Sequence, residues 1–193
     1  MQPSRTAYAD PLRHPRTGLV RTLHLLLAAL LAAGACLSAG LVTARPAHAL
    51  TLRTPERRLL ALVNATRKAH GLPRLRVVAS LERASRAHSL QMVTKDYFSH
   101  SSFDGESFAA RLVRLGYKSA GYSSWTAGED IAYGTGSAST ARAIFKAWMH
   151  SPGHRRVILT RRYRDCGVGR ARGTYCGTSG VVFFTLDCAA RSK

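Results

Sequence analysis

The sequence predicts an α+β protein, a sandwich in which helices cover a small antiparallel sheet. Apolar residues at helical spacing dominate most of the region after residue 50, whereas a strand–turn–strand pattern fills the end of the chain. The length of 193 residues accommodates one such domain preceded by a targeting segment.

The predicted helices are marked by capping residues and by apolar side chains three or four positions apart. Thr54-Pro55-Glu56 predicts a helix start, because it combines a capping hydroxyl with a proline and an acid in the first turn. Ser80 is expected to cap a second helix, in which His88 is expected to be a core residue with one hydrogen bond. The first helix is expected to bury Leu59, Leu62, Val63 and Thr66. Three further helical segments are expected: Ser107–Leu115, one opening at Ser139-Thr140, and Pro152–Leu159 capped by Ser151.

The end of the chain predicts a β-hairpin. Its strands are residues 165–170 and 181–188, joined by turn residues between 173 and 180. Cys166 and Cys188 are equidistant from position 177, so antiparallel pairing places them opposite each other, within disulfide reach. We therefore expect a Cys166–Cys188 disulfide, which leaves Cys176 as a buried or free thiol. Residues 121–136 are rich in glycine and aromatic residues and predict only a short, irregular strand or loop.

Residues 1–49 have the layout of a secretory signal peptide. Arginines precede an uncharged apolar run at residues 25–42, and Ala47-His48-Ala49 matches a small-x-small cleavage site. Cleavage there leaves residues 50–193 as a secreted or extracellular domain that is free to associate with the cell envelope and has no membrane span. An uncleaved anchor is the alternative, since the apolar run of 18 residues is at the low end for a spanning helix.

The formal net charge of +19 comes mostly from arginine. Such a surface favours polyanions, namely anionic cell-wall polymer, anionic lipid or nucleic acid. Seven arginines cluster around His154 in the sequence: Arg155, Arg156, Arg161, Arg162, Arg164, Arg170 and Arg172. Specific binding of nucleic acid is not expected, because the aromatic residues do not interleave with these arginines as a stacking groove requires. The alternative is an arginine-biased, solvated surface without a partner.

His100, Glu129 and His154 are the candidate site residues. Two imidazoles and a carboxylate suit zinc, and the same groups suit general acid–base work. The sequence lacks a Gly-x-Ser-x-Gly elbow, a His-Glu-x-x-His helix and a phosphate-binding glycine loop, which disfavours an enzyme. The structural alternative is that Glu129 pins a loop to a helix through hydrogen bonds.

Several segments occur in an order that resembles the CAP superfamily, the cysteine-rich secretory, antigen 5 and pathogenesis-related 1 proteins, also called SCP domains. They are Leu59–Gly71, Ala84–His88, Phe98-Ser99-His100, Gly128-Glu129, Trp148–His154 and Cys166-Gly167-Val168-Gly169. The resemblance covers about residues 55–188, and the chain is similar to the bacterial branch of the family. Membership implies an α-β-α sandwich.

In many members of that family, two histidines and two glutamates line a central cleft that can hold a divalent cation. By resemblance, His100, Glu129 and His154 match three of these residues. Ser151 stands at the position of the second glutamate, and Asp130 stands where the family usually has asparagine. The loss of one carboxylate weakens the expectation of a metal.

These observations favour a secreted, non-enzymatic, monomeric binding module of the cell envelope or extracellular space. Its cleft, formed by His100, Glu129, Ser151 and His154, is expected to bind a ligand, with or without a divalent cation such as zinc. One alternative is a peptidase or esterase that uses a cleft histidine as base. Another is an arginine-rich surface protein that binds anionic wall polymer or lipid.

Overall fold

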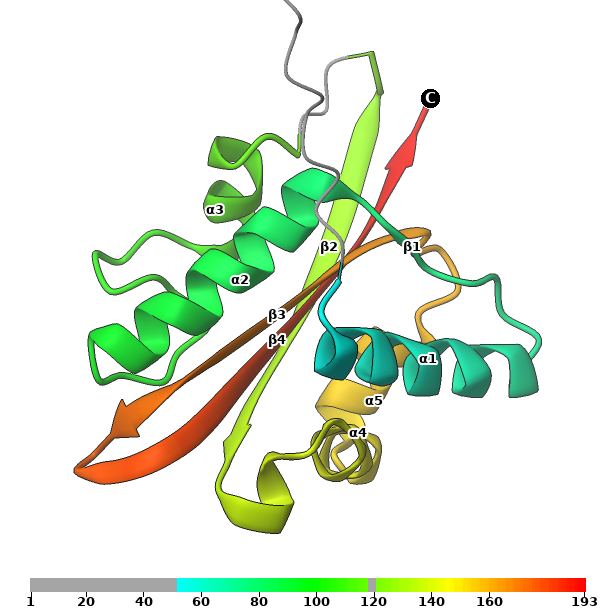
Figure 1. The fold of residues 1–193 in the computed structure, drawn as a ribbon. Helices are drawn as coiled ribbons and strands as arrows, with labels where there is room; N and C mark the ends of the chain where they lie inside the picture. The colour runs from blue at the N-terminus through cyan, green and yellow to red at the C-terminus, as the bar shows by residue number, and fades with distance from the viewer. Residues whose placement is uncertain (1–51, 118–120) are drawn as a thin grey trace, which may run out of the picture. The chain divides into compact units, whose positions relative to one another are not determined.

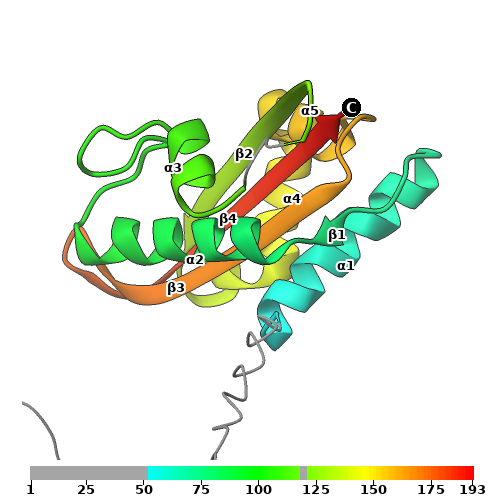
Figure 2. The ribbon, with the colours of Figure 1, turned by 90° about the horizontal axis from the view of Figure 1, so that it is seen from above.

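The computed structural model describes residues 52–117 and 121–193, and these form three layers, with helices on both faces of one sheet (Figures 1 and 2). Two helices cover one face: α2 (Ala79–Thr94) and α3 (Phe108–Arg114). Three cover the other: α1 (Thr54–Ala69), α4 (Ala141–His150) and α5 (Pro152–Leu159). The predicted α-β-α sandwich is therefore confirmed. The predicted signal peptide, residues 1–49, lies outside the described residues.

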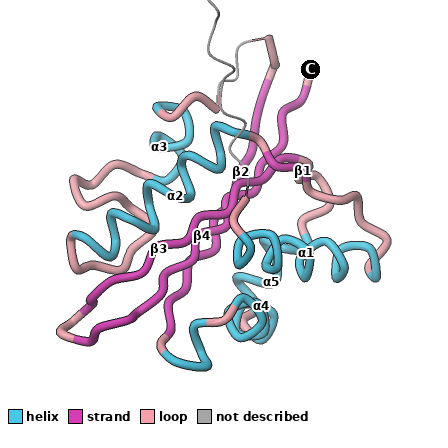
Figure 3. Tube along the Cα trace, viewed as in Figure 1, coloured by secondary structure: helices cyan, strands magenta, loops and turns pink. Residues whose placement is uncertain are grey.

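The sheet has four strands in the order β1-β3-β4-β2 (Figure 3). They are β1 (Arg76–Val77), β2 (Ser124–Gly134), β3 (Asp165–Tyr175) and β4 (Thr178–Ser192). β4 pairs antiparallel with both β3 and β2, whereas β1 pairs parallel with β3. The sheet is therefore mixed, and the purely antiparallel sheet expected from the sequence is wrong at this edge. A strand of two residues is too short to produce an alternating pattern.

Strand β2 is longer and more regular than the sequence predicted. Instead of a short, irregular piece, it spans 11 residues and pairs with β4 from Ser124↔Ser192 to Gly134↔Val182. Pairing and burial in the tertiary structure override the poor strand propensity of its glycines. Gly128 has a specific steric role, because a Cβ at this position would lie 2.8 Å from the Tyr163 hydroxyl.

The helix opening predicted at Thr140 is confirmed, the caps predicted at Thr54 and Ser80 are wrong, and Ser107 is a cap that the sequence did not single out. The side chains of Ser107 and Thr140 accept hydrogen bonds from the backbone N–H three residues later, at 3.3 and 3.2 Å. Thr54 is the first residue of α1, whose N-cap N–H donates to Glu56 at 2.6 Å instead. Ser80 lies inside α2, one residue after its start.

The buried face of α1 contains three polar residues, Glu56 among them, that the apolar pattern did not identify. Leu62 and Thr66 are only partly buried, whereas Asn64 and Arg67 are buried. Asn64 exchanges two hydrogen bonds with the backbone of Leu75, at 2.8 and 3.1 Å. These contacts fasten α1 to the segment that leads into β1.

Among the described residues, no helix has the length and apolar character needed to cross a membrane.

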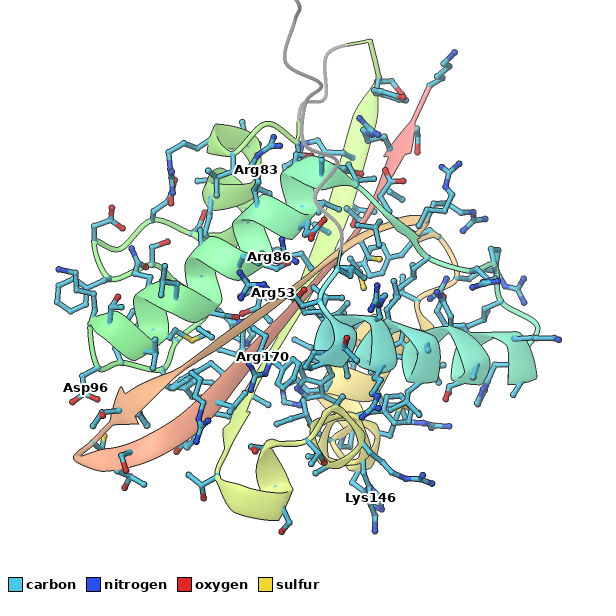
Figure 4. The ribbon with its side chains drawn as sticks, in the orientation of Figure 1. Arg53, Arg83, Arg86, Asp96, Lys146 and Arg170 are labelled. Atoms are coloured by element: carbon cyan, nitrogen blue, oxygen red, sulfur yellow. The ribbon has the colours of Figure 1, made fainter. Side chains whose placement is uncertain are left out.

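The predicted hairpin register is confirmed, since Cys166 and Cys188 are direct cross-strand partners. Both cysteines are buried with free thiols in this structure. Cys176 is exposed in the two-residue turn between β3 and β4, where it adopts φ 46° and Gly177 adopts φ 74°. The turn is held against the end of α2, because the Cys176 N–H donates to Asp96 at 2.7 Å (Figure 4). The disulfide itself remains a prediction.

Thiol reactivity distinguishes the three cysteines of residues 50–193, the predicted mature chain, which is the protein to titrate because Cys36 lies in the predicted signal peptide. Burial raises the pKa of Cys166 to about 12 and also raises the pKa of Cys188, so native protein should present one reactive thiol, Cys176. Titration with a thiol reagent before and after unfolding without reductant checks this. No additional thiol on unfolding means that Cys166 and Cys188 form the predicted disulfide, and two additional thiols contradict it. A Cys176→Ser variant is the control, because it should remove the native signal.

Candidate functional site

The three candidate residues come from different elements and meet at one side of the sheet. His100 lies in the loop between α2 and α3, Glu129 lies in the middle of β2, and His154 lies in the first turn of α5. The two histidines line a cavity of about 320 Å³, whose other lining residues are Phe98, Ser99, Ser101 and Ile131. Glu129 is buried and is not among the lining residues of this cavity.

The Glu129 carboxylate holds the loop that carries His100. One oxygen, Oε1, lies 2.8 Å from His100 Nδ1, and the other accepts a hydrogen bond from the Arg111 guanidinium. Arg111 also donates to the His100 carbonyl at 3.2 Å and to Ser102 Oγ at 3.0 Å. The His100 side chain remains 53% exposed. Glu129 therefore orients an imidazole that faces solvent, and Arg111 stabilises the buried carboxylate.

His88 is the core histidine that the sequence predicted. Its side chain is fully buried, and Nε2 lies 2.9 Å from the Ser99 carbonyl. Burial lowers the pKa of His88 to about 4, although the carboxylate of Glu129, 3.9 Å away, acts in the opposite direction. The neutral ring of His88 therefore holds the loop before His100 through its hydrogen bond to the Ser99 carbonyl.

His154 forms the other wall of the cavity, on α5. Burial lowers the pKa of His154, and the neighbouring His100 lowers it further, so the ring is neutral at neutral pH. Its ring centroid lies 6.4 Å from that of Trp148. Ser151 is the N-cap of α5, makes no capping hydrogen bond with its side chain, and does not line the cavity.

The described residues do not fit a zinc site of three ligands. No group of three histidine, cysteine or acidic side chains among them is placed to hold a metal ion. The one carboxylate at the site is already paired with Arg111 and His100, and a guanidinium in contact with it opposes a second cation. The expectation of His100, Glu129 and His154 as a metal triad is thus not supported by the geometry.

The serines near the histidines do not complete a nucleophilic site. Ser102 Oγ is engaged with Arg111 and Glu106, and Ser99 Oγ accepts from a backbone N–H. Within residues 52–117 and 121–193, no serine hydroxyl hydrogen-bonds the ring of His100 or His154. The Glu129–His100 pair is therefore an oriented imidazole without a hydrogen-bonded serine among the described residues.

Sequence reasoning missed the polar groups that position this site. Arg111 is 1% exposed although it lies on a short surface helix. Beneath α2, Ser85 donates to Asp187 at 2.7 Å, and the hydroxyls of Ser89 and Thr185 lie 2.9 Å apart. The detectable signal was a pair of serines four residues apart, Ser85 and Ser89, beside the apolar stripe of α2, which indicates a buried polar partner on the sheet.

Comparison with known proteins agrees with this architecture. The sequence pattern of the cysteine-rich secretory protein family, CAP, matches residues 60–188. The chain belongs to the CAP family. The CAP domain is 38% identical over 114 residues to the uncharacterized protein YkwD of Bacillus subtilis, and the match covers 59% of this chain and 41% of that protein. The uncharacterized membrane protein YlbC of the same organism is 33% identical over 123 residues, covering 63% and 33%. The chain thus spans less than half the length of either relative.

Two solved structures share the fold. An extracellular protein with an SCP domain from Bacillus anthracis superposes with a TM-score of 0.58 and 27% identity, covering 70% of this chain and 40% of that one. An outer surface protein from Borrelia burgdorferi has a TM-score of 0.58 and 19% identity, covering 70% and 92%. These likenesses support the CAP fold of the bacterial type.

Asp130 is an unpaired acid in the core of this CAP domain. Its side chain is fully buried, and neither carboxyl oxygen has a hydrogen-bond partner among the described residues. Burial raises the pKa of Asp130 to about 8, and the adjacent Glu129 adds to the effect. Folding therefore favours the protonated acid, so this contribution to stability is complete below pH about 4 and is lost as the pH rises through about 8.

We expect Asp130→Asn to stabilise the domain at pH 9 by about 1–3 kcal/mol, because the amide is uncharged at every pH. The gain should shrink as the pH falls toward 5, where most of the native Asp130 is protonated. Urea unfolding at both pH values measures it. The exposed Asp104→Asn is the matched control and should show no such pH-dependent gain. Equal unfolding free energies for parent and Asp130→Asn at pH 9 would contradict the prediction.

Proposed function

We propose that this protein is a secreted, non-enzymatic binding module whose cleft, lined by His100 and His154, takes a small ligand. The observation that carries the proposal is an imidazole fixed by a buried carboxylate and facing a second, neutral imidazole across an open cavity. Such rings each offer one donor and one acceptor. The oriented pair supports recognition, and the missing hydroxyl disfavours nucleophilic hydrolysis.

Secretion is supported by two independent observations. Residues 1–49 have the order of a signal peptide, and structural relatives are described as an extracellular protein and an outer surface protein. Retention at the envelope, a monomeric state and an anionic wall polymer or lipid as partner remain predictions from the sequence.

The lining of the cleft indicates the chemistry of its ligand. Phe98 is 41% exposed and, with Ile131, gives the cavity an apolar side, while the two imidazoles give it a polar side. A ligand that fits both sides has an apolar ring or short chain beside a group that accepts and donates hydrogen bonds. A volume of about 320 Å³ suits a small molecule or the end of a larger one.

Histidine ring resonances test the proposal directly. A library of small polar aromatic compounds is titrated while the NMR signals of both rings are followed. Binders should shift His100 and His154 together and should lose at least about tenfold in affinity with His100→Ala/His154→Ala. The control His70→Ala/His150→Ala replaces two exposed histidines whose rings bond only to backbone carbonyls. If both double variants bound the compounds with the same affinity, the histidine cleft would not be the binding site.

Two further measurements address the alternatives. Zinc calorimetry should give the same heat for the parent and for His100→Ala/His154→Ala, because the described residues do not form a three-ligand site.

Turnover of a peptide or ester panel that disappears with Glu129→Gln would instead identify a hydrolase and contradict a non-enzymatic role.

A further inference from the structure

A second cavity lies beside the first residues of β2, and residues from the end of β4 and the start of β1 also line it. It has a volume of about 500 Å³ and shares no lining residue with the histidine cleft. Its lining consists of four arginines, one acid, three hydroxyl side chains, two aromatic residues and one alanine: Arg76, Arg162, Arg164, Arg191, Asp165, Ser124, Thr126, Ser192, Tyr122, Trp125 and Ala190. The histidine cleft, by comparison, has no arginine in its lining.

The charge in this cavity is unbalanced. Four guanidiniums from β1, the α5–β3 loop and β4 converge on it, and Asp165 is its one carboxylate. Asp165 lies 3.2 Å from Arg191 and 3.6 Å from Arg76, so it balances one charge of the four. The excess positive charge favours an anion, and guanidiniums match phosphate oxygens in geometry as well as in charge.

One of the cationic groups, Arg191, is positioned before any ligand binds. Asp165 is buried and also accepts a hydrogen bond from the Tyr117 hydroxyl at 2.9 Å, which fixes the carboxylate that holds Arg191. The Arg191 guanidinium lies 4.7 Å from the ring centroids of both Tyr117 and Tyr122. A guanidinium held between an acid and two rings loses little freedom on binding, which increases its contribution to affinity.

Two of the arginines remain available to a ligand. Arg76 is 77% exposed in its side chain, and its nearest acid oxygen is the one 3.6 Å away. Arg162 is exposed, and its guanidinium makes no hydrogen bond or ion pair with a residue that the structure describes. Two exposed guanidiniums, one in a long ion pair and one without a partner among the described residues, are the expected state of an anion site without its ligand.

The remaining lining suits a hydroxyl-bearing ligand. Ser124, Thr126 and Ser192 supply hydroxyls, and the partly exposed Trp125 supplies an aromatic surface of the kind that packs on a sugar or polyol face. None of the large apolar side chains exposed in the described part of the chain lines the cavity, so membrane insertion has no support here.

We propose that this arginine-lined cavity binds a phosphate group carried on a sugar or polyol, as in one unit of a soluble anionic polymer. It is a second site that goes beyond the histidine cleft. The cluster of arginines in the sequence contributes only Arg162 and Arg164 to it, and the other two come from distant segments.

The two tryptophans of the chain give a site-specific signal, because Trp125 lines the cavity and Trp148 is 1% exposed in the core. Glucose 1-phosphate should change the tryptophan emission of the purified protein, and Trp125→Phe should abolish that change while calorimetry still detects binding. Arg76→Gln/Arg162→Gln should weaken binding at least about tenfold, since each lost guanidinium removes a charge-assisted bond.

The control Arg57→Gln/Lys146→Gln removes an equal number of charges from exposed positions on α1 and α4 that do not line the cavity. Lys146 is labelled in Figure 4. Binding within about twofold of the parent is expected for it. Equal weakening in both double variants would overturn the site, because net charge alone would explain it. Binding to phosphatidylglycerol vesicles without binding to glucose 1-phosphate, or glucuronate bound as tightly as glucose 1-phosphate, would also overturn it. The His100→Ala/His154→Ala variant should bind glucose 1-phosphate normally, which separates this proposal from the histidine cleft.

Discussion

Gly169→Ala is expected to destabilise the domain by at least about 3 kcal/mol, beyond what overpacking usually costs. A Cβ at Gly169 would lie 2.1 Å from the backbone carbonyl of Ser85 in α2, and one at Gly167 would lie 2.1 Å from that of Leu81. The obstruction in each case is helix backbone, which cannot rotate away as a side chain can. The helix would have to move off the sheet, and the contacts beneath α2 would separate.

Urea unfolding of Gly169→Ala and Gly167→Ala measures this effect. Gly153→Ala is the matched control, because a Cβ at Gly153 meets nothing within 4 Å and the residue lies inside α5. Alanine there should leave stability unchanged or raise it by up to about 1 kcal/mol, as in other helical positions. A Gly169→Ala variant within about 0.5 kcal/mol of the parent would show that α2 is not held at this distance.

Arg67→Met is expected to cost about 3–5 kcal/mol, because it removes a buried charge whose partners stay behind. Arg67 is fully buried in α1 and donates to four backbone carbonyls. These are the carbonyls of Pro73 at 2.9 Å, Ile158 at 2.7 Å, Thr160 at 3.0 Å and Tyr163 at 3.0 Å. The last three carbonyls lie at the end of α5 or in the loop between α5 and β3. This one side chain therefore fastens α1 to the end of the helix that carries His154.

Arg67→Lys should recover little of that loss, since an ammonium cannot reach carbonyls arranged around a planar fork. The control Arg57→Met replaces an exposed arginine of the same helix, whose side chain bonds only to Thr54, and should change stability by less than about 0.5 kcal/mol. Thermal and urea unfolding of the three variants provide the comparison. Similar values for Arg67→Met and Arg57→Met would contradict a structural role for the buried guanidinium.

The fold was predictable where local pattern and tertiary structure agree. In α2, Leu81, Ala84, His88 and Met92 are all buried as their spacing indicated. In the hairpin, the equal distance of Cys166 and Cys188 from the turn predicted their pairing. β1 and the regular form of β2 were missed, because both depend on hydrogen bonds to strands that are distant in the sequence, with paired residues 48 or more positions apart.

The candidate site was predicted in part. The sequence identified His100, Glu129 and His154, and the structure brings the two histidines to one cavity with Glu129 behind His100. It could not identify Arg111, whose surface helix gives no sign that its guanidinium turns inward to the carboxylate. That contact changes the chemistry, because it replaces a free metal ligand with an ion pair.

The sequence by itself determined the family, the helices, the hairpin register and the two histidines of the cleft, since each depends on a local pattern of side chains. The tertiary structure decided which charges and polar groups meet. Arg67 with the carbonyls around α5, Arg111 with Glu129, the unpaired Asp130 and the arginine-lined cavity all join groups from distant segments. No local pattern encodes such encounters, because burial and Coulomb energy depend on distance in space and not on separation along the chain.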